Sequence, residues 1–582
     1  MRYPKLKELN TSREMVDVFK GYNHNLRIGE GEFYDMKNLS SDNYPVLSPR
    51  PKRGIYATPN NPQGMVAKDA LCYVDGGDFV INEKRVSMHL STDDDKPKTL
   101  ISMGAYVIIM PDKKYINTAN LEDYGKIEVA FATTAATTFE LCKVDGVGYG
   151  DAVTQDTAPT DPKNMDLWID TSETPHQLKQ YSSTTDMWSA IATTYIKISS
   201  PGIGKPFSVN DGVTIAGVES LPDLNASMVI WAKGDDYIVV TGILDKVTTQ
   251  TTSISVTRLM PNMDFIIESE NRLWGCRYGA AINGEMVNEI YACKLGDFKN
   301  WNCFMGISTD SYAATVGTDG QFTGAITHLG YPIFFKENYM HKVYGNYPAN
   351  YQIQTTACRG VQKGCERSLA IVNEVLYYKA RSGICAYDGS LPQEMSSALG
   401  DISYNNAVGG VLGNKYYISM SDAEETYHLF VYDTKKGMWH REDNTQADDF
   451  CNCRGDLYFI DHGDEHGQRA IKTVKGTGVT ETEEITWEAI TGIIGTDSPD
   501  KKYISRLDVR MSLQVGTRVV FSVEYDSSGE WEYLFMMAGT SLRSFAVPIR
   551  PKRCDHLRLR IEGYGDAKIY SICKTVEQGS DV

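Results

Sequence analysis

Residues 430–443, FVYDTKKGMWHRED, contain the pattern that decides the fold. An apolar, aromatic segment ends at Asp433, a polar turn with Gly437 follows, and Trp439 opens a second apolar segment. Glycine supplies the backbone freedom that a tight turn needs, and aromatic residues favour strands. The stretch therefore predicts a β-hairpin.

Related hairpin patterns recur along the chain, as KLGDFKNW at 294–301, SSTTDMW at 182–188 and EYDSSGEWEY at 524–533. In the second half, the turn residues Asn373, Asn414 and Gly455 lie 41 residues apart, and Gly330 lies 43 residues before Asn373. A period of about 40–50 residues is typical of one four-stranded blade of a β-propeller. Together with two earlier units near residues 70 and 104, this period predicts a propeller of about seven blades. The alternative is a series of unrelated hairpins in a β-sandwich.

The composition agrees with an all-β protein of several domains. The 582 residues are 42% hydrophobic and 23% charged, and they include 35 tyrosines and 50 glycines. Such a chain is too long for one ordinary core, and tyrosine with glycine favours strands joined by tight turns. Helix is expected only in two short segments, at 10–22 and 28–40.

The repeat is interrupted twice, which predicts two further β domains. Residues 126–260 begin with a Thr- and Ala-rich stretch and continue as short strands, and the segment after residue 475 alternates apolar with polar side chains. The predicted organisation is an N-terminal arm with the first propeller strands (1–60), the first propeller part (61–125), an inserted all-β domain (126–260), the second propeller part (261–475) and a C-terminal β-sandwich or jelly roll (476–582).

Charge and hydropathy limit the functions that fit. No apolar run approaches the ~20 residues that span a bilayer, and the N-terminus has no apolar signal-peptide core, so we expect no membrane-spanning segment. The formal net charge is -17, although both ends of the chain are mildly basic. An acidic protein does not wrap DNA for affinity, but it can line a path along which DNA slides without sticking.

Two segments carry a resemblance to a known group of proteins. They are KGYNHNLRIGEGEFYDMKNLSSDNYPVLSPRPKRG at 20–54 and VPIRPKRCDHLRLRIEGYGDAKIYSI at 547–572, on either side of the hairpin repeats. In this arrangement the chain resembles tail and neck proteins of tailed phages, namely the nozzle proteins of short-tailed phages and the packaged-DNA stabilisation proteins.

The resemblance implies a non-enzymatic structural protein of the virion tail or neck. Such a protein assembles in the host cytoplasm into a homo-oligomeric ring, most simply a hexamer. The ring contacts neighbouring tail or neck proteins and conducts or retains the packaged genome, so double-stranded DNA passes through it transiently. No cofactor is expected.

Basic residues near both ends are candidates for docking. They are Arg50, Lys52 and Arg53 in the N-terminal segment and Arg550, Lys552, Arg553, Arg558 and Arg560 near the C-terminus. These side chains can touch DNA phosphate, or they can dock on the acidic propeller of a neighbouring subunit. Contact between unlike charges in an acidic assembly favours the docking interpretation.

The inserted domain suggests a second function, adhesion at the tail tip. Trp168, Tyr181 and Trp188 are candidates for stacking on the sugar rings of a host glycan, although core packing is the commoner role of such residues. A propeller glycosidase is a third hypothesis, because Asp433, Gly437 and Trp439 resemble the Asp-box of sialidases. Val431 occupies the position where that pattern has Ser or Thr.

Metal and catalytic motifs are weak in this sequence. The twelve cysteines include no CxxC pair, and the acidic run at 92–98 lacks the spacing of a calcium loop. The stretch 461–467, DHGDEHG, offers histidines and carboxylates, but its glycines favour a solvated turn. No phosphate-binding loop, serine-hydrolase motif or zinc-protease motif is present. We therefore expect no catalytic or metal site.

Overall fold

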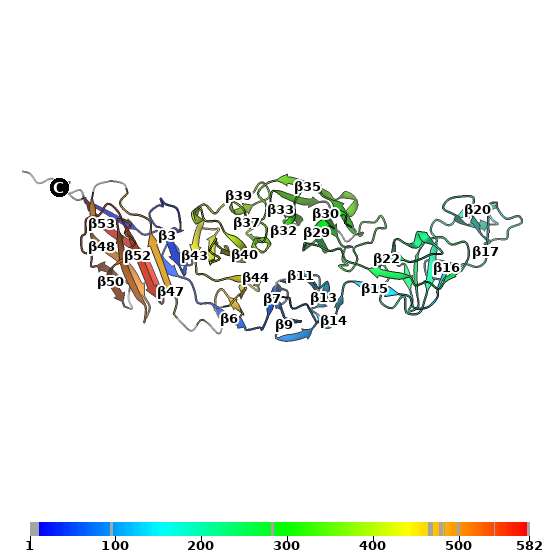
Figure 1. Cartoon of the computed structure of the whole chain (residues 1–582), viewed down its shortest axis with the longest axis horizontal. Helices are drawn as coiled ribbons and strands as arrows, with labels where there is room; N and C mark the ends of the chain where they lie inside the picture. The colour runs from blue at the N-terminus through cyan, green and yellow to red at the C-terminus, as the bar shows by residue number, and fades with distance from the viewer. Residues whose placement is uncertain are drawn as a thin grey trace, which may run out of the picture. The chain divides into compact units, whose positions relative to one another are not determined.

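The structure is a computed structural model, drawn in Figure 1. It describes residues 11–93, 97–280, 284–463, 469–476, 481, 484–496, 501–539 and 542–578. The chain forms two compact units. The first comprises Met1–Leu100, Phe334–Met340 and Thr356–Val582, and the second comprises Ile101–Ile333 and His341–Thr355.

The described residues form β-strands and four single-turn 3₁₀ helices, which confirms the all-β class. The helices are η1 (Pro222–Leu224), η2 (Pro348–Asn350), η3 (Glu366–Ser368) and η4 (Ser397–Leu399). None of the helices in the described part of the chain has the length and apolar character to cross a membrane.

The prediction of short helices at 10–22 and 28–40 is wrong. These segments contain strands β1 (Thr11–Val16) and β3 (Glu32–Lys37). Strand β1 pairs along its whole length with β53 (Ala567–Gln578), at the far end of the chain. Because that partner is so distant in sequence, the local pattern of residues 10–22 contains no trace of it, and tertiary pairing overrides the local propensity.

Within the described residues, seven groups of four strands build the repeating part of the chain. Six groups are consecutive in sequence: β7 (Pro62–Ala67), β8 (Leu71–Asp75), β9 (Asp78–Ile81) and β10 (Lys84–Ser87); β11 (Thr99–Met103), β12 (Tyr106–Met110), β13 (Lys114–Asn117) and β14 (Asn120–Lys126); β28 (Phe265–Ser269), β29 (Arg272–Ala280), β30 (Met286–Ala292) and β31 (Tyr312–Thr315); β32 (Phe322–His328), β33 (Tyr331–Lys336), β34 (Tyr339–Tyr344) and β35 (Gln352–Ala357); β36 (Ala370–Val372), β37 (Val375–Ala380), β38 (Gly383–Tyr387) and β39 (Gln393–Glu394); and β40 (Asn405–Leu412), β41 (Lys415–Ser421), β42 (Tyr427–Asp433) and β43 (Met438–Arg441). The seventh combines β44 (Ala447–Cys453), β45 (Asp456–Asp461) and β46 (Ala470–Thr473) with the N-terminal strand β6 (Gly54–Ala57).

The turn residues that define the sequence period occupy equivalent positions in four of these groups. Gly330, Asn373, Asn414 and Gly455 each lie in the turn between the first and second strand of their sheet. Asn373 adopts a positive φ of 48°, as a tight hairpin requires. Its side-chain amide donates to the Asn414 side chain at 2.9 Å, so two neighbouring turns touch. The period therefore marks successive equivalent sheets, as predicted.

Neighbouring sheets pack through their first strands. In the first unit, β36 lies beside β40, β40 beside β44, and β44 beside β7. In the second unit, β28 lies beside β32, and the sheets β11–β14 and β28–β31 share one apolar core that includes Ile108, Leu273 and Trp301. A four-stranded sheet cannot bury both of its faces alone, so each sheet depends on its neighbours for stability.

Residues 129–258 form three further sheets in the second unit. Their strands, in sheet order, are β15 (Val129–Ala132), β27 (Ser255–Arg258), β22 (Gly212–Ala216) and β23 (Ser227–Val229); β24 (Ala232–Lys233), β25 (Tyr237–Thr241), β21 (Tyr195–Ser199), β16 (Thr137–Cys142) and β26 (Thr248–Gln250); and β17 (Ala152–Gln155), β18 (Leu167–Asp170), β19 (Gln177–Ser182) and β20 (Met187–Ala190). All three sheets contribute to one core, with Ile215 from the first sheet, Ile196 from the five-stranded sheet, and Ile169 and Leu178 from the third.

The C-terminal strands form two sheets with strands from the N-terminus. One continues the β40–β43 group through β2 (Gly21–Tyr22), β3, β47 (Thr486–Thr491), β52 (Leu557–Tyr564) and β49 (Arg518–Tyr525) to β50 (Glu532–Ala538). The other contains β1, β53, β48 (Lys502–Leu513) and β51 (Arg543–Val547), and β4 (Leu39–Ser40) pairs with β5 (Ser48–Pro49) nearby. A cavity of about 630 Å³ lies between the two sheets, lined by apolar residues such as Phe33, Ile504 and Leu559. Part of the predicted N-terminal arm therefore completes the C-terminal β structure, while β2 pairs with β43 and β6 with β46 of the repeat.

Trp487 and Gly563 form a tightly packed cross-strand pair between β47 and β52. The indole of Trp487 covers the glycine, and its Nε1 donates to the carbonyl of Gly565 at 3.0 Å. A Cβ added at Gly563 would lie 1.9 Å from the indole. The aromatic ring thus occupies the space that any side chain at residue 563 needs.

We predict that Gly563→Ala destabilises the chain by about 1–3 kcal/mol, because the buried indole must leave its position. Denaturant unfolding followed by tryptophan fluorescence measures this loss. Gly150→Ala is the matched control, since a Cβ there meets nothing within 4 Å. Equal stability of Gly563→Ala and the wild type would contradict the packing described for this pair.

Candidate functional site

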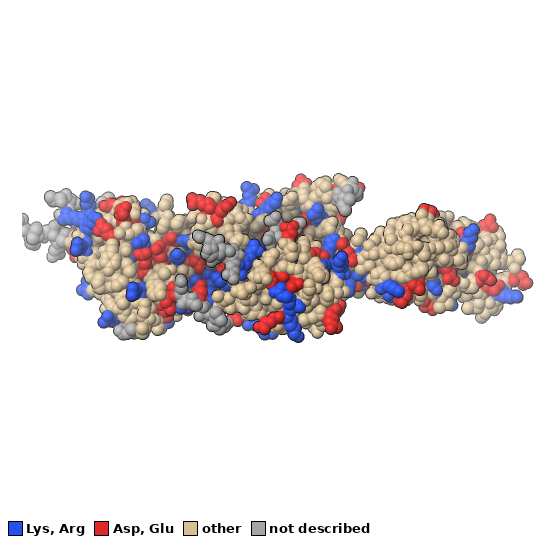
Figure 2. Space-filling view, turned by 60° about the horizontal axis from the view of Figure 1, so that its bottom comes forward, with Lys and Arg blue, Asp and Glu red and all other residues tan. Residues whose placement is uncertain are grey.

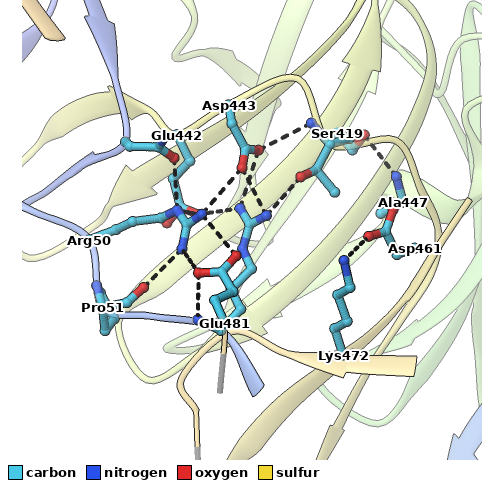
Figure 3. Close-up of polar contacts among 12 residues, drawn as sticks. Arg50, Pro51, Ser419, Glu442, Asp443, Ala447, Asp461, Lys472 and Glu481 are labelled. Atoms are coloured by element: carbon cyan, nitrogen blue, oxygen red, sulfur yellow. Dashed lines mark hydrogen bonds and ion pairs between the residues drawn. The ribbon is translucent and has the colours of Figure 1, made fainter. Parts of the chain in front are cut away.

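Arg50 and Arg53 lie in a buried cluster with three carboxylates of the same chain (Figure 3). The Arg53 guanidinium contacts Glu442 at 2.8 Å and Asp443 at 2.9 Å. Arg50 contacts Glu481 at 3.0 Å. The two arginine side chains are 6% and 4% exposed. The cluster joins three segments that are far apart in the sequence.

Electrostatics keep Arg53, Asp443 and Glu481 of this cluster charged. Burial alone would raise the pKa of Asp443, but the positive charges of Arg53 and Arg50 outweigh burial and hold that pKa well below the ordinary aspartate value. Burial opposes the charge of Arg53 as well, and the carboxylates of Asp443 and Glu442 outweigh it and raise the pKa of the guanidinium. A hydrogen bond from Arg50 likewise lowers the pKa of Glu481 against the effect of burial.

The predicted docking role of Arg50 and Arg53 therefore needs correction. Their acidic partners lie in the same chain, and burial removes both guanidinium groups from DNA phosphate and from a neighbouring subunit. Lys52 between them is about one-third exposed and pairs with the half-exposed Glu484 at 3.0 Å. Sequence reasoning found the basic residues but missed the carboxylates, since nothing local connects residue 53 with residue 443.

The C-terminal basic residues lie at the surface of β52 and the segment before it. Arg558 donates to the buried Glu524 at 2.6 Å, and Arg560 pairs with Glu562 at 3.1 Å. Both guanidinium groups lie within 6 Å of the Trp531 ring centroid, at 5.8 and 4.9 Å. The structure thus assembles a cation–π group that the sequence did not indicate.

Lys552, Arg550 and Arg553 are exposed. Lys552 pairs with Glu532 and lies 4.7 Å above the Tyr525 ring. On the face shown in Figure 2, Lys and Arg are interspersed with Asp and Glu rather than gathered into a continuous basic band. Contact of these C-terminal residues with DNA or with another subunit stays a prediction.

The three aromatic candidates of the inserted region meet on one sheet, β17–β20. Trp188 contacts Trp168 in a T-shaped pair at 5.5 Å and Tyr181 in a tilted pair at 5.4 Å. Tyr181 and Trp188 are cross-strand partners in the β19–β20 hairpin. The opposite face of the sheet carries Ile169 and Leu178, which belong to the core. The alternation of β-strands therefore places the aromatic side chains on the side away from that core.

The three rings differ in accessibility. Trp168 is 6% exposed, because Trp188 covers one side and the ammonium of Lys179 lies 5.1 Å from its ring centroid. Tyr181 and Trp188 are half-buried, and the Tyr181 hydroxyl donates to Asp186 at 2.5 Å. Trp168 thus supports the other two rings, which remain available for stacking.

Polar groups that sequence reasoning missed surround these rings. Lys179 donates to Asp170 at 2.7 Å, and this hydrogen bond lowers the pKa of Asp170 to about 2. The Trp168 indole donates to the backbone carbonyl of Gln155 at 3.0 Å. Aromatic rings with fixed hydrogen-bonding groups beside them are the chemistry that recognises a sugar ring. The period-2 alternation of residues 177–182 was the available signal for Lys179.

The Asp-box resemblance corresponds to a structural turn. Asp433 is buried, accepts a hydrogen bond from Ser41 at 2.6 Å, and accepts another from the Lys436 N–H at 3.2 Å. Both carboxylate oxygens of Asp433 therefore hold the turn and its neighbour in place.

Arginine, tyrosine and acid side chains do meet in a hollow of about 260 Å³, which Arg367, Tyr427, Asp448, His462 and Arg469 help to line. The polar groups of these side chains mostly contact one another. Arg367 donates to the Asp448 carbonyl at 2.8 Å, and the Asp448 carboxylate lies 2.9 Å from His462 and 3.8 Å from Arg469. These contacts hold the ends of the strands together.

The candidate metal-binding stretches fall partly outside the described residues. Residues 464–467 of the 461–467 stretch and residues 94–96 of the 92–98 run lie there. Asp461 pairs with Lys472 at 2.5 Å. Within the part of the chain that the structure describes, no three His, Cys, Asp or Glu side chains are grouped so as to hold a metal ion.

Comparison with known proteins gives no family for this chain. No family model and no curated protein matches it. Among solved structures, exo-β-1,3-galactanase from Phanerochaete chrysosporium aligns over 53% of this chain and 94% of that chain, at 8% identity and a TM-score of 0.22. Chaetomium thermophilum Raptor aligns over 74% of this chain and 30% of that chain, at 9% identity and a TM-score of 0.26. Trypanosoma rangeli sialidase aligns over 98% of this chain and 97% of that chain, at 8% identity and a TM-score of 0.21. Likeness at these TM-scores carries no argument about activity or ligand.

We predict that Arg53→Met destabilises the chain by about 3 kcal/mol, because Glu442 and Asp443 then lose their nearest cation and keep only the longer contacts of Arg50, at 3.9 and 3.5 Å. Lys52→Met is the control and should cost about 0–1 kcal/mol, since its ion pair with Glu484 is partly exposed. Denaturant unfolding of both variants at neutral pH checks the difference. Equal losses of unfolding free energy in the two variants would show that the cluster contributes no more to stability than the partly exposed pair of Lys52 and Glu484.

Proposed function

We propose that the chain is a structural virion protein of a phage tail or neck, similar in role to a nozzle protein. In this proposal the seven four-stranded groups are blades of one β-propeller, and residues 129–258 and the C-terminal sheets are modules added to it. The observation that carries the proposal is the series of equivalent sheets whose last member is completed by the N-terminal strand β6. A strand from the other end of the repeat closes a ring of blades without leaving an open edge.

The proposed role is mechanical: six copies form a ring that conducts or retains the packaged genome. The charge supports passage rather than tight binding of DNA. The net charge is -17, and Arg50, Arg53, Arg558 and Arg560 are neutralised by carboxylates of the same chain. Phosphate binding needs Lys and Arg that are free to release counterions from the duplex. A conduit with paired basic residues lets DNA slide.

Electron microscopy and particle composition test this role. We expect purified protein to form rings with a mass of about six times the 64.9 kDa chain, measured by mass photometry and negative-stain images. We also expect mass spectrometry to find the protein in phage particles induced from the strain that carries the gene. A chain that stays monomeric at micromolar concentration and is absent from purified particles would exclude the proposal.

The aromatic face of β17–β20 favours a second candidate function, adhesion to a host glycan at the tail tip. Tyr181 and Trp188 present half-buried rings beside Asp170 and Lys179. This candidate does not depend on the ring, because the face belongs to a sheet with its own place in the core of residues 129–258.

We predict that the full chain binds at least one surface glycan on an array and that Trp188→Ala weakens this binding about tenfold, because a stacking ring is lost. Met187→Ala is the matched control. Met187 is the preceding residue, it is 63% exposed, and it points to the other face of the strand. Equal loss in both variants, or no binding by the wild type, would count against adhesion through this face.

A further inference from the structure

Strand β50 ends the ten-stranded sheet and leaves an open edge. It pairs on one side with β49, and among the described strands no partner lies on its other side. An edge strand presents a row of unpaired backbone N–H and C=O groups that another strand can join. The backbone geometry of β50 thus specifies the class of partner, which is an extended β-strand.

Beyond its first three residues, β50 lacks the devices that usually protect such an edge. Its sequence is EYLFMMA, with a single charged residue, Glu532, at its start. Tyr533 is 64% exposed, Met536 45% and Phe535 37%. Natural edge strands are usually blunted by lysine, proline or inward-pointing charges. In β50 such devices are confined to the first three residues, as a bulge at Leu534 and as Glu532, which lies opposite the buried Val523. No charge and no proline interrupts the strand from Phe535 to Ala538.

The buried apolar face of the ten-stranded sheet ends at β50. Phe535 is the cross-strand partner of Phe521, and Met537 is the partner of Val519. Phe521, Val519 and Met537 are buried, whereas Phe535 is more than one-third exposed. The apolar side chains on this face of β52 and β49 therefore continue onto β50, where Phe535 is left partly exposed to solvent. One more strand of the same kind would extend that face.

We propose that β50 pairs with β50 of a second copy of this chain, in antiparallel orientation, so that the two sheets join across a two-fold axis. The charge pattern of the strand selects this occupant. Antiparallel pairing places the two Glu532 carboxylates, each beside its own Lys552, at opposite ends of the interface between the two β50 strands. The apolar residues of one copy then face those of the other, and no like charges oppose each other.

This inference is independent of the proposed ring. A hexamer can contain both contacts when it is built as three such pairs, and a protein that forms no ring can still pair through β50. Failure of the ring therefore leaves the β50 contact standing, and failure of the β50 contact leaves the ring standing. The two are separated by variants that change only the edge strand.

A cysteine placed on the strand tests the contact. In Met536→Cys, mild oxidation of the purified full chain should yield a disulfide-linked dimer that reducing agent dissolves. Met286→Cys is the matched control, because Met286 is a methionine of similar or greater exposure (64%) on β30. Absence of a dimer in Met536→Cys, or equal cross-linking in both variants, overturns the proposal.

A charge on the same residue gives a second readout that does not depend on disulfide geometry. Met536→Lys should weaken self-association about tenfold in sedimentation velocity, because two lysines then lie in that interface, while the melting temperature stays close to that of the wild type. Met286→Lys should leave association unchanged. Wild-type protein that associates as strongly as Met536→Lys would show that β50 meets another partner or none.

Discussion

The structure depends on one constraint, that a four-stranded sheet with two apolar faces is too small to cover itself. Tyr378, Tyr416 and Phe430 lie fully buried in strands of such sheets, and each needs neighbouring side chains on both sides of its sheet. The chain meets this need by repetition, so that β36, β40, β44 and β7 lie side by side. Each sheet supplies the cover of the next, and removing one would expose two faces at once.

Ion pairs that are buried in one cluster fix how the N-terminal segment joins this body. Arg50 and Arg53 bring Glu481 and the pair Glu442–Asp443 to one point. Buried pairs contribute less to net stability than their geometry suggests, because removing both partners from water is costly. Their effect is to allow a single arrangement, since any shift of the segment leaves a charge buried alone. The strand β6, which follows Arg53 directly, is thereby placed at the edge of β46.

The repeating sheets could be predicted from the sequence because their signal is local. A turn residue such as Asn373 or Gly455 marks the start of each hairpin, and turn chemistry acts over a few residues. The pairing of β1 with β53, and the place of β3 beside β47, left no such signal, because the partners are hundreds of residues apart. The same distance hid the carboxylates around Arg53. The aromatic residues of β17–β20 were found by type, while their unequal exposure depends on Lys179 and on ring packing that only coordinates reveal.

The pairing of the N-terminal strands with late strands has a consequence for biosynthesis. Strand β6 finds its partner only when residues 470–473 have left the ribosome, and β1 waits for residues 567–578. During translation β1 and β6 therefore remain without their final partners until more than four hundred further residues have been made, whereas β4 can pair locally with β5. The last repeat and the C-terminal sheet of β1 are completed only after their late strands have been made, and a product that stops before them carries unsatisfied edges that invite aggregation.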